Sequence, residues 1–233
     1  MKATLHTRIV EPELLETLPE DHPDAIRARK DLLLVNRIMG NHRWIIHTLR
    51  RHCQPGWRIT EIGAGDGALS RRLWQSGICH AGDLHAFDLA RRPSTWPKEA
   101  AWTQGDIFHH PLPATEVLVA NLFLHHFQDD ALRVLGGRIS PSTLLIIAAE
   151  PARWRIHTLL GRLLCGIARL HPVTRYDMQV SIRAGFRGGE LPSARGLGAE
   201  WEVRTGCTAL GAYHLAAWRR ENPPDLAPNV FPC

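Results

Sequence analysis

Three glycines with a carboxylate just before them are the residues of this sequence best suited to bind a ligand. Glu61 stands two positions before Gly63, and Gly65 and Gly67 follow at the same spacing. Glycine lets backbone N–H groups approach a ligand without a Cβ in the way. The spacing differs from the G-x-G-x-x-G pattern that seats a pyrophosphate at a helix N-terminus. A carboxylate here would repel a pyrophosphate, so the pattern favours a ligand with positive charge and no phosphate.

Other polar side chains follow two more predicted strands. Asp88 ends one of them, where a carboxylate can accept two hydrogen bonds from a ribose diol. His125 and His126 come shortly after another strand, and sites of open α/β sheets lie at the carboxyl ends of the strands. Histidine is the natural base for an acceptor that must lose a proton near neutral pH. We therefore expect His126, or else His125, to act as base or substrate contact.

Four motifs in this order resemble the class I methyltransferases that use S-adenosylmethionine, in particular bacterial small-molecule members of quinone or polyketide type. They are the glycine turn, Asp88, the pair Gly105–Asp106 and the Leu-His-His-Phe run at 124–127, within residues 57–150. The resemblance implies S-adenosyl-L-methionine as cofactor and S-adenosyl-L-homocysteine as product. It also implies that Asp106 meets the adenine amino group beside Ile107. The cofactor-binding residues that it implies are Glu61, Gly63, Ala64, Gly65, Gly67, Asp88, Leu89, Gly105, Asp106, Ile107 and Asn121.

Alternating strands and helices must position these residues. The predicted strands cover residues 57–62, 83–88, 101–105, 117–121, 144–149, 201–208 and 213–218, and helices are expected near 67–76, 127–137 and 154–170. This alternation implies βαβ units and a mainly parallel sheet. The connection between the last two strands is too short for a helical crossover, so they form an antiparallel hairpin. We expect an α/β fold, a Rossmann-like seven-stranded methyltransferase sheet with an antiparallel last strand.

The chain divides into a helical N-terminal cap at 1–54, a cofactor-binding domain at 55–220 and a proline-rich, disordered tail at 221–233. The cap, with helices at 11–18, from 23 or 24 to 39, and at 43–52, can cover the site or serve only for packing. Residues 151–199 are long for a crossover and are expected to form an insert or lid. Residues of this insert that can line the acceptor pocket are Arg175, Tyr176, Asp177 and Arg183.

Within the insert, apolar residues recur on one face of the helix predicted at 154–170. They are Leu159, Leu160, Leu163, Leu164, Ile167 and Leu170, while Arg155, Arg162 and Arg169 recur every seven residues on another face. Two interpretations stay open. The helix can pack its leucines on the core, or it can form a lid over an apolar substrate and make transient contact with a membrane surface.

Net charge and composition indicate which partners and which cell compartment suit this protein. The net charge is +5, and residues 151–220 hold 11 arginines against 4 acids. Such an excess suits nucleic acid, an anionic substrate, a membrane surface or a solvated face. The sequence holds neither a membrane span nor a signal peptide, so we expect a cytoplasmic protein. Five scattered cysteines indicate reduced thiols. Neighbouring histidines should point their rings apart, so we expect no metal.

The sequence favours a small-molecule methyltransferase of secondary metabolism that acts on oxygen or carbon of an apolar aromatic acceptor, such as a phenol, quinol or polyketide. An RNA or protein methyltransferase that uses the arginine-rich C-terminal half is the first alternative. The strand before Leu122 lacks the Asn/Asp-Pro-Pro-aromatic run that presents a base nitrogen, which disfavours nucleic acid. A non-catalytic binding scaffold is the second alternative. The acceptor and the oligomeric state stay open.

Overall fold

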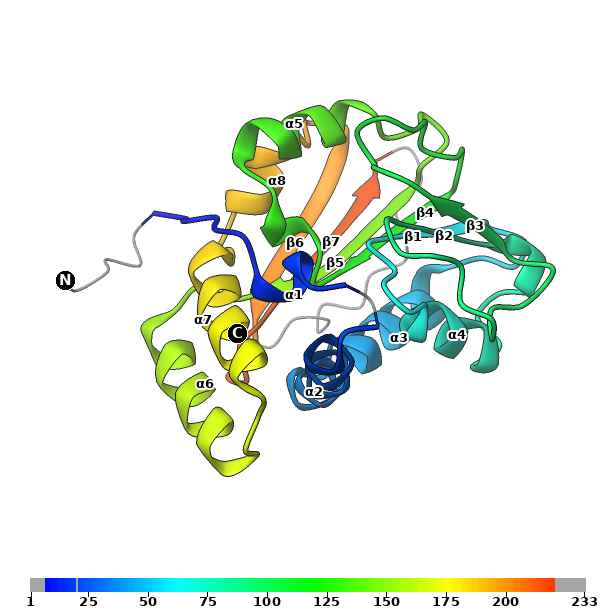
Figure 1. Cartoon of the computed structure of the whole chain (residues 1–233). Coiled ribbons are helices and arrows are strands. Elements are labelled where there is room, and N and C mark those ends of the chain that lie inside the picture. Colours follow the sequence, from blue (N-terminus) through cyan, green and yellow to red (C-terminus); the bar gives the residue numbers. More distant parts are fainter. Residues whose placement is uncertain (1–6, 20, 221–233) are drawn as a thin grey trace.

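A computed structural model describes residues 7–19 and 21–220 (Figure 1). The predicted tail at 221–233 lies outside the described residues. Seven strands form one sheet in the order β3-β2-β1-β4-β5-β7-β6. Their bounds are Ile59–Ile62 (β1), Leu84–Asp88 (β2), Ala101–Gln104 (β3), Val117–Asn121 (β4), Leu145–Pro151 (β5), Trp201–Cys207 (β6) and Ala212–Arg219 (β7). Strand β7 runs antiparallel to both of its neighbours, β5 and β6, and the other pairs are parallel. The predicted fold class is confirmed.

The central strands are buried on both faces because helices cover both sides of the sheet. In β4, Leu118 and Ala120 face a core shared with α5 (Asp129–Gly137) and α8 (Glu190–Ala194). The alternate residues Val117 and Val119 face a second core, shared with α3 (Asn41–His52) and α4 (Ala68–Gln75). Side chains alternate between the two faces of a strand, so a continuous apolar run such as β4 fills both cores at once. This packing fixes the strand ends that carry the candidate site.

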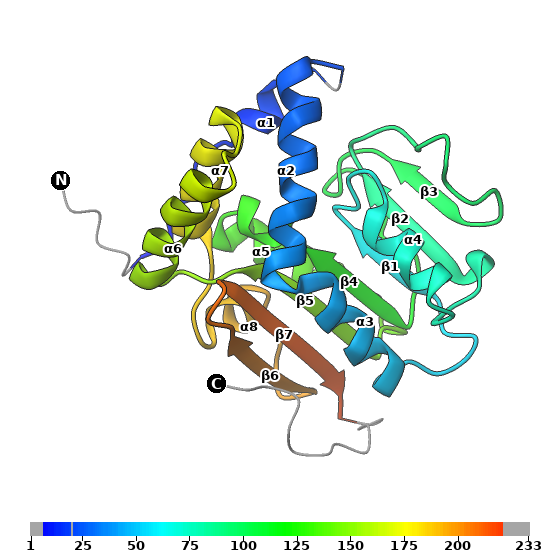
Figure 2. The same ribbon diagram turned by 90° about the horizontal axis from the view of Figure 1, so that it is seen from below.

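Helices α2 (Pro23–Met39) and α3 cross the middle of the view in Figure 2, in front of the sheet. A short α1 (Leu14–Thr17) precedes α2, which leads into α3. Pro23 occupies the first turn of α2, and Gly40 ends the helix in the left-handed conformation with φ of +75°. These are the local signals that favour a helix start and stop, and they explain why the predicted bounds of α2 agree with the structure.

The segment predicted as an insert contains three helices. Besides α6 (Arg155–Ile167), the chain forms α7 (Pro172–Ala184) and α8, which the sequence pattern did not predict. Helices α6 and α7 pack against each other, and α7 also contacts α1 and α2. Of the two interpretations left open for this helix, packing on the core does not hold for Leu159 and Ile167, which are exposed. Among the described residues, no helix has both the length and the apolarity needed to cross a bilayer.

Candidate functional site

The glycine loop between β1 and α4 is held in a conformation that only glycine adopts easily. Gly63, Gly65 and Gly67 have φ of +69°, +56° and +71°. A Cβ on Gly63 would meet the Phe123 ring at 2.1 Å, and one on Gly67 would meet Trp96 at 2.6 Å. Around Gly65 nothing lies within 4 Å of the Cβ position, so the loop offers open space there. Backbone groups can therefore approach a ligand at this point.

Asp88 lies at the end of β2 and joins this strand to the glycine loop. Its Oδ2 accepts a hydrogen bond from the backbone N–H of Gly65 at 2.8 Å, and its Oδ1 accepts one from Ala90 at 2.7 Å. The backbone N–H groups of Gly63 and Ala64 both donate to the carbonyl of Phe87 in the same strand. A carboxylate has about four acceptor positions, so Asp88 keeps capacity for ligand hydroxyls.

Glu61 is buried beneath the loop, with 2% of its surface exposed. Its Oε2 accepts hydrogen bonds from both the backbone N–H and the hydroxyl of Ser70, on α4. Burial raises the pKa of Glu61 to about 8 against these opposing hydrogen bonds. The carboxyl therefore ties the loop to the first turns of α4, and its placement favours this role over direct contact with a charged ligand.

The turn after β3 brings a second acid to the same edge of the sheet. Asp106 accepts hydrogen bonds from the backbone N–H of Phe108 at 2.8 Å and from Nδ1 of His109 at 2.9 Å. The hydrogen bond from the Phe108 backbone lowers the pKa of Asp106. Ile107 is buried in the core, whereas Leu89 after β2 is 71% exposed.

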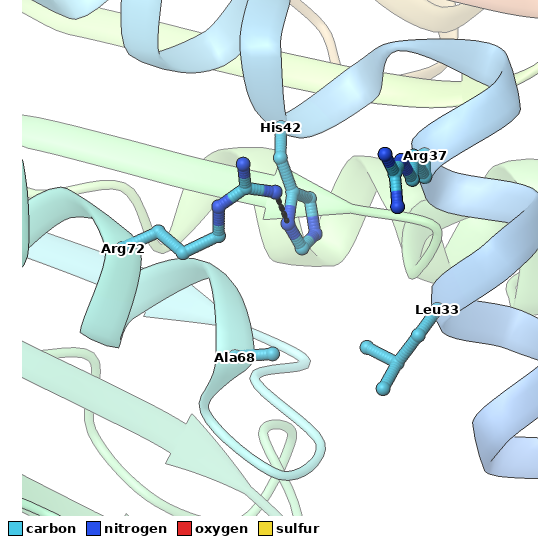
Figure 3. A pocket seen from close by; sticks show the side chains of 5 residues that line it. All are labelled: Leu33, Arg37, His42, Ala68 and Arg72. Carbon is cyan, nitrogen blue, oxygen red and sulfur yellow. Dashed lines mark hydrogen bonds between the residues drawn. The ribbon is translucent and has the colours of Figure 1, made fainter.

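A cavity of about 350 Å³ opens beside the glycine loop, between the N-terminal helices and α4 (Figure 3). Arg72 donates a hydrogen bond to Nδ1 of His42 at 3.3 Å across this cavity. Burial and the neighbouring charge of Arg72 lower the pKa of His42 to about 4, so this ring is neutral. Its Nε2 lies 3.4 Å from the amide nitrogen of Asn121, at the end of β4. The lining residues are Leu33, Arg37, His42, Ala68 and Arg72.

No local motif pointed to His42, Arg37 or Arg72. For His42 and Arg37 the sequence did hold an indication, because the helices that precede the glycine motif, α2 and α3, carry basic residues. The contact of Asn121 with His42 and with Oδ1 of Asn36 at 3.1 Å now links these helices to the end of β4.

His125 lies in a short 3₁₀ turn, η2 (Leu124–His126), between two carboxylates. Nδ1 donates to Glu150 at 2.8 Å, and Nε2 is 3.4 Å from Oε1 of Glu13. Glu150, at the end of β5, also accepts the backbone N–H groups of Phe123 and Leu124. Burial opposes the charge on His125, but hydrogen bonds to the two carboxylates outweigh it and raise its pKa to about 9. His125 is therefore protonated at neutral pH.

His126 has a different environment, although its ring centroid is only 4.2 Å from that of His125. Its Nδ1 is 2.8 Å from Oε1 of Glu16, and its side chain is 21% exposed. The expectation that the two rings point apart is wrong, because it assumed a helix or a strand and the residues lie in a 3₁₀ turn. Ligand atoms of Glu13, His125 and His126 lie within 4.8 Å of one another, close enough to hold a metal ion. In the structure His125 is paired with Glu13 and Glu150, and His126 is paired with Glu16.

Glu13 and Glu16 belong to an N-terminal strap, which we define as residues 8–17. Arg8 donates to the carbonyl oxygens of Ala184 at 2.9 Å and of Phe127 at 3.0 Å. Its guanidinium also lies over the Phe186 ring, 4.2 Å from the centroid. These contacts join the strap to η2, to α7 and to the residues that follow them.

The residues predicted to line an acceptor pocket all lie on α7, where two of them hold the strap. Asp177 accepts the backbone N–H groups of Leu14 at 2.7 Å and Leu15 at 3.1 Å. Arg183 forms an ion pair with Glu11 at 2.7 Å. Arg175 donates to the carbonyl oxygen of Leu170, and Tyr176 is exposed. Asp177 and Arg183 are thus committed to contacts within the protein.

Comparison with solved structures identifies several similar folds. Human N-acetylserotonin methyltransferase in complex with SAM is 17% identical, with a TM-score of 0.57. The comparison covers 88% of this chain and 61% of that chain. The plantazolicin methyltransferase BpumL, in complex with a triazolic desmethylPZN analogue and SAH, is 11% identical, with a TM-score of 0.65 and coverage of 88% and 93%. The pyocyanin biosynthetic protein PhzM is 14% identical, with a TM-score of 0.57 and coverage of 89% and 62%.

The chain thus spans less than two thirds of the length of two of these proteins. No family model matches the sequence, and no curated protein does. At these identities the similarity establishes the fold. The chain has the class I fold of S-adenosylmethionine-dependent small-molecule methyltransferases, as the four sequence motifs predicted.

Proposed function

We propose that this protein transfers a methyl group from S-adenosyl-L-methionine to a small acceptor and releases S-adenosyl-L-homocysteine. The observation that carries the proposal is the edge of the sheet where the glycine loop, Asp88 and Asp106 meet. Open space at Gly65 and the unused acceptor capacity of Asp88 suit a nucleoside. Solved structures of the same fold support the proposal, since two of them are complexes with SAM or SAH.

The residues at this edge fit the parts of that cofactor. Asp88 would accept the ribose hydroxyls, while Asp106 and Ile107 would meet the adenine. Arg37 and Arg72 in the cavity carry positive charge suited to the amino-acid carboxylate. When bound, the cofactor supplies an electrophilic methyl group on a sulfonium. The protein must then align the acceptor and exclude water.

We assign the proton-accepting role to His126. Its Nδ1–H donates to Glu16, which leaves the lone pair on Nε2 to accept a proton from an acceptor hydroxyl. His125 is less suited, because both of its ring nitrogens face carboxylates and its pKa of about 9 keeps it charged. We infer that His125 instead fixes the η2 turn and thereby the position of His126.

For the acceptor we propose an oxygen or carbon of an apolar aromatic molecule, such as a phenol, quinol or polyketide of secondary metabolism. The Leu-His-His-Phe run after β4 supports a small molecule over RNA or protein. Similar structures include a pyocyanin biosynthetic protein and a plantazolicin methyltransferase, which agrees with natural-product chemistry. We expect the protein to act in the cytoplasm.

Isothermal titration of the full chain with S-adenosylmethionine, S-adenosylhomocysteine and NADH tests the cofactor. We expect saturation with both sulfur nucleosides and no binding of NADH. Asp88→Ala should weaken their binding at least about 100-fold, because two hydrogen bonds to a charged group, each worth about 1.5–3 kcal/mol, together contribute about 3 kcal/mol or more. The control is Asp130→Ala, at an exposed acid on α5 that should leave affinity unchanged. Saturation with NADH alone would reject the proposal.

Product mass spectrometry with a panel of phenols and quinols tests the acceptor and the base. His126→Gln should reduce turnover about 100-fold or more, in the range typical of a lost general base, without changing cofactor affinity. Full turnover of this variant would show that His126 does not accept the proton.

A further inference from the structure

Helix α6 exposes an apolar stripe that nothing among the described residues covers. Ile156, Leu159 and Ile167 are 54%, 63% and 74% exposed, and Leu160 is 37% exposed. Positions 156, 159, 160 and 167 fall on one face at a helical repeat. A contiguous exposed apolar surface of this kind marks a binding surface more often than isolated exposed residues do.

The opposite face of α6 is already used for packing. His157 and Cys165 are buried there, and Gly161 lies so close to α7 that an added Cβ would meet the sulfur of Met178 at 3.0 Å. The helix is therefore apolar on two sides, and only one side serves the fold. Packing within this chain therefore does not explain why the exposed face of α6 is apolar.

Positive charge lies at both ends of the stripe. Between residues 151 and 176 the sequence holds five arginines and no acid, although Arg153 is buried and forms an ion pair with Glu190. Arg155 and Arg169, at the two ends of α6, are both exposed. Just before the helix, Trp154 is 45% exposed and the guanidinium of Arg187 stacks 4.3 Å from its ring centroid. An amphipathic tryptophan beside arginines is typical of segments that lie at a membrane–water interface.

The position of α6 leaves the stripe accessible. The helix lies at the outer edge of the molecule in both views (Figures 1 and 2). Its 13 residues correspond to about 20 Å, which is too short to cross a bilayer but sufficient to lie along its surface.

Two partners could cover an apolar stripe with this border. A second copy paired through α6 would bring its arginines near those of the first copy, and this segment holds no acid to compensate them. An anionic phospholipid surface supplies both the apolar layer and the negative charge.

We propose that α6 docks the protein reversibly onto anionic membranes. Trp154, Leu159 and Ile167 enter the boundary between headgroups and acyl chains, and Arg155 and Arg169 meet lipid phosphates. This inference is independent of the proposed methyl transfer.

Co-sedimentation of the full chain with vesicles tests the proposal. The two probes are vesicles of phosphatidylcholine alone and of phosphatidylcholine mixed with phosphatidylglycerol. We expect pelleting with the anionic vesicles only, and a decrease as salt is added, because salt screens the attraction of exposed charges. No pelleting with anionic vesicles at low salt would overturn the proposal, and so would equal pelleting with both kinds.

Two double variants separate the contributions. Leu159→Gln with Ile167→Gln should weaken binding at least about 10-fold, since two apolar side chains no longer leave water. Arg155→Gln with Arg169→Gln should weaken binding to the anionic vesicles about 30-fold, because each arginine near an anionic surface contributes to the attraction. The same double variant should make binding less dependent on salt. Val134→Gln, at an exposed valine on α5 outside the stripe, is the matched control.

Light scattering after size exclusion distinguishes the second copy. A dimer of the wild type that Leu159→Gln with Ile167→Gln converts to a monomer would show that α6 is a subunit interface and would overturn the membrane proposal. All the substituted side chains are exposed, so the variants should keep the wild-type melting temperature.

Discussion

Deprotonation of His125 should destabilise the folded protein at alkaline pH. The ring lies between Glu13 and Glu150, and these contacts raise its pKa from 6.5 to about 9 against the effect of burial. The folded state thus holds a proton that the unfolded chain releases more easily. The resulting stabilisation is complete below pH 6.5 and is lost as the pH rises to about 9.

The size of the effect follows from the shift. Each pKa unit corresponds to about 1.4 kcal/mol, so the charged ring contributes about 3 kcal/mol to the free energy of unfolding. Little of this is lost to solvent screening, because the side chain of His125 is only 4% exposed and that of Glu150 is fully buried. Glu13→Gln removes one of the two carboxylates and should reduce the contribution of the charged His125 ring to the free energy of unfolding to about half.

Urea unfolding at pH 6 and at pH 9.5 measures this contribution. Glu61 also titrates, since burial raises its pKa to about 8, and its ionisation destabilises the fold as the pH rises. We therefore compare the decrease in the free energy of unfolding between pH 6 and pH 9.5 in the wild type with the decrease in His125→Gln. Glu61 is present in both proteins, so its contribution cancels. We expect a difference of about 3 kcal/mol. Parallel losses in the two proteins would refute the assignment of a charged His125.

Substitutions at three further positions test contacts of the site. Glu61→Gln should change the free energy of unfolding at pH 7 by less than about 1 kcal/mol, because the amide oxygen can still accept hydrogen bonds from Ser70. Glu61→Ala should lower it by about 1–3 kcal/mol. Equal losses for the two variants in urea unfolding would contradict a buried, protonated carboxyl at Glu61. Gly67→Ala should lower the melting temperature by at least about 2–4 °C, since its left-handed φ and the Trp96 ring oppose a Cβ, and an unchanged value would contradict that geometry. Asp177→Ala should expose the strap to proteolysis, and wild-type resistance would show that the strap is held elsewhere.

The fold was predictable because its signals are local or periodic. Strand β4 covers Val117–Asn121 in both the prediction and the structure, and α2 begins at Pro23 and ends before Gly40. Such segments need no knowledge of distant residues, since proline, glycine and apolar runs act within a few positions. The antiparallel β7 followed from the short connection to β6.

The contacts around the histidines were not predictable, because their partners lie far away in sequence. Glu13 and His125 are separated by 112 positions. Asp177 is 163 positions from Leu14, and it lies on α7, a helix that the sequence pattern did not predict. A sequence indicates which side chains are polar, but pairing over such distances depends on how α7 packs against the N-terminal segment.

The strap links the geometry of the proposed base to local helix formation. Glu13 and Glu16 form a capping box at the start of α1, in which the backbone N–H of Glu13 donates to Oε2 of Glu16 at 3.4 Å. The same two side chains also face the histidines: Oε1 of Glu13 lies near His125, and Oε1 of Glu16 lies near His126. A four-residue helix cannot maintain this turn alone, since isolated short helices are unstable in water. Asp177 on α7 supplies the missing support by binding two backbone N–H groups of α1. The orientation of His126 by Glu16 therefore depends on the packing of α7, and a substitution there can impair the proton-accepting step without touching either histidine.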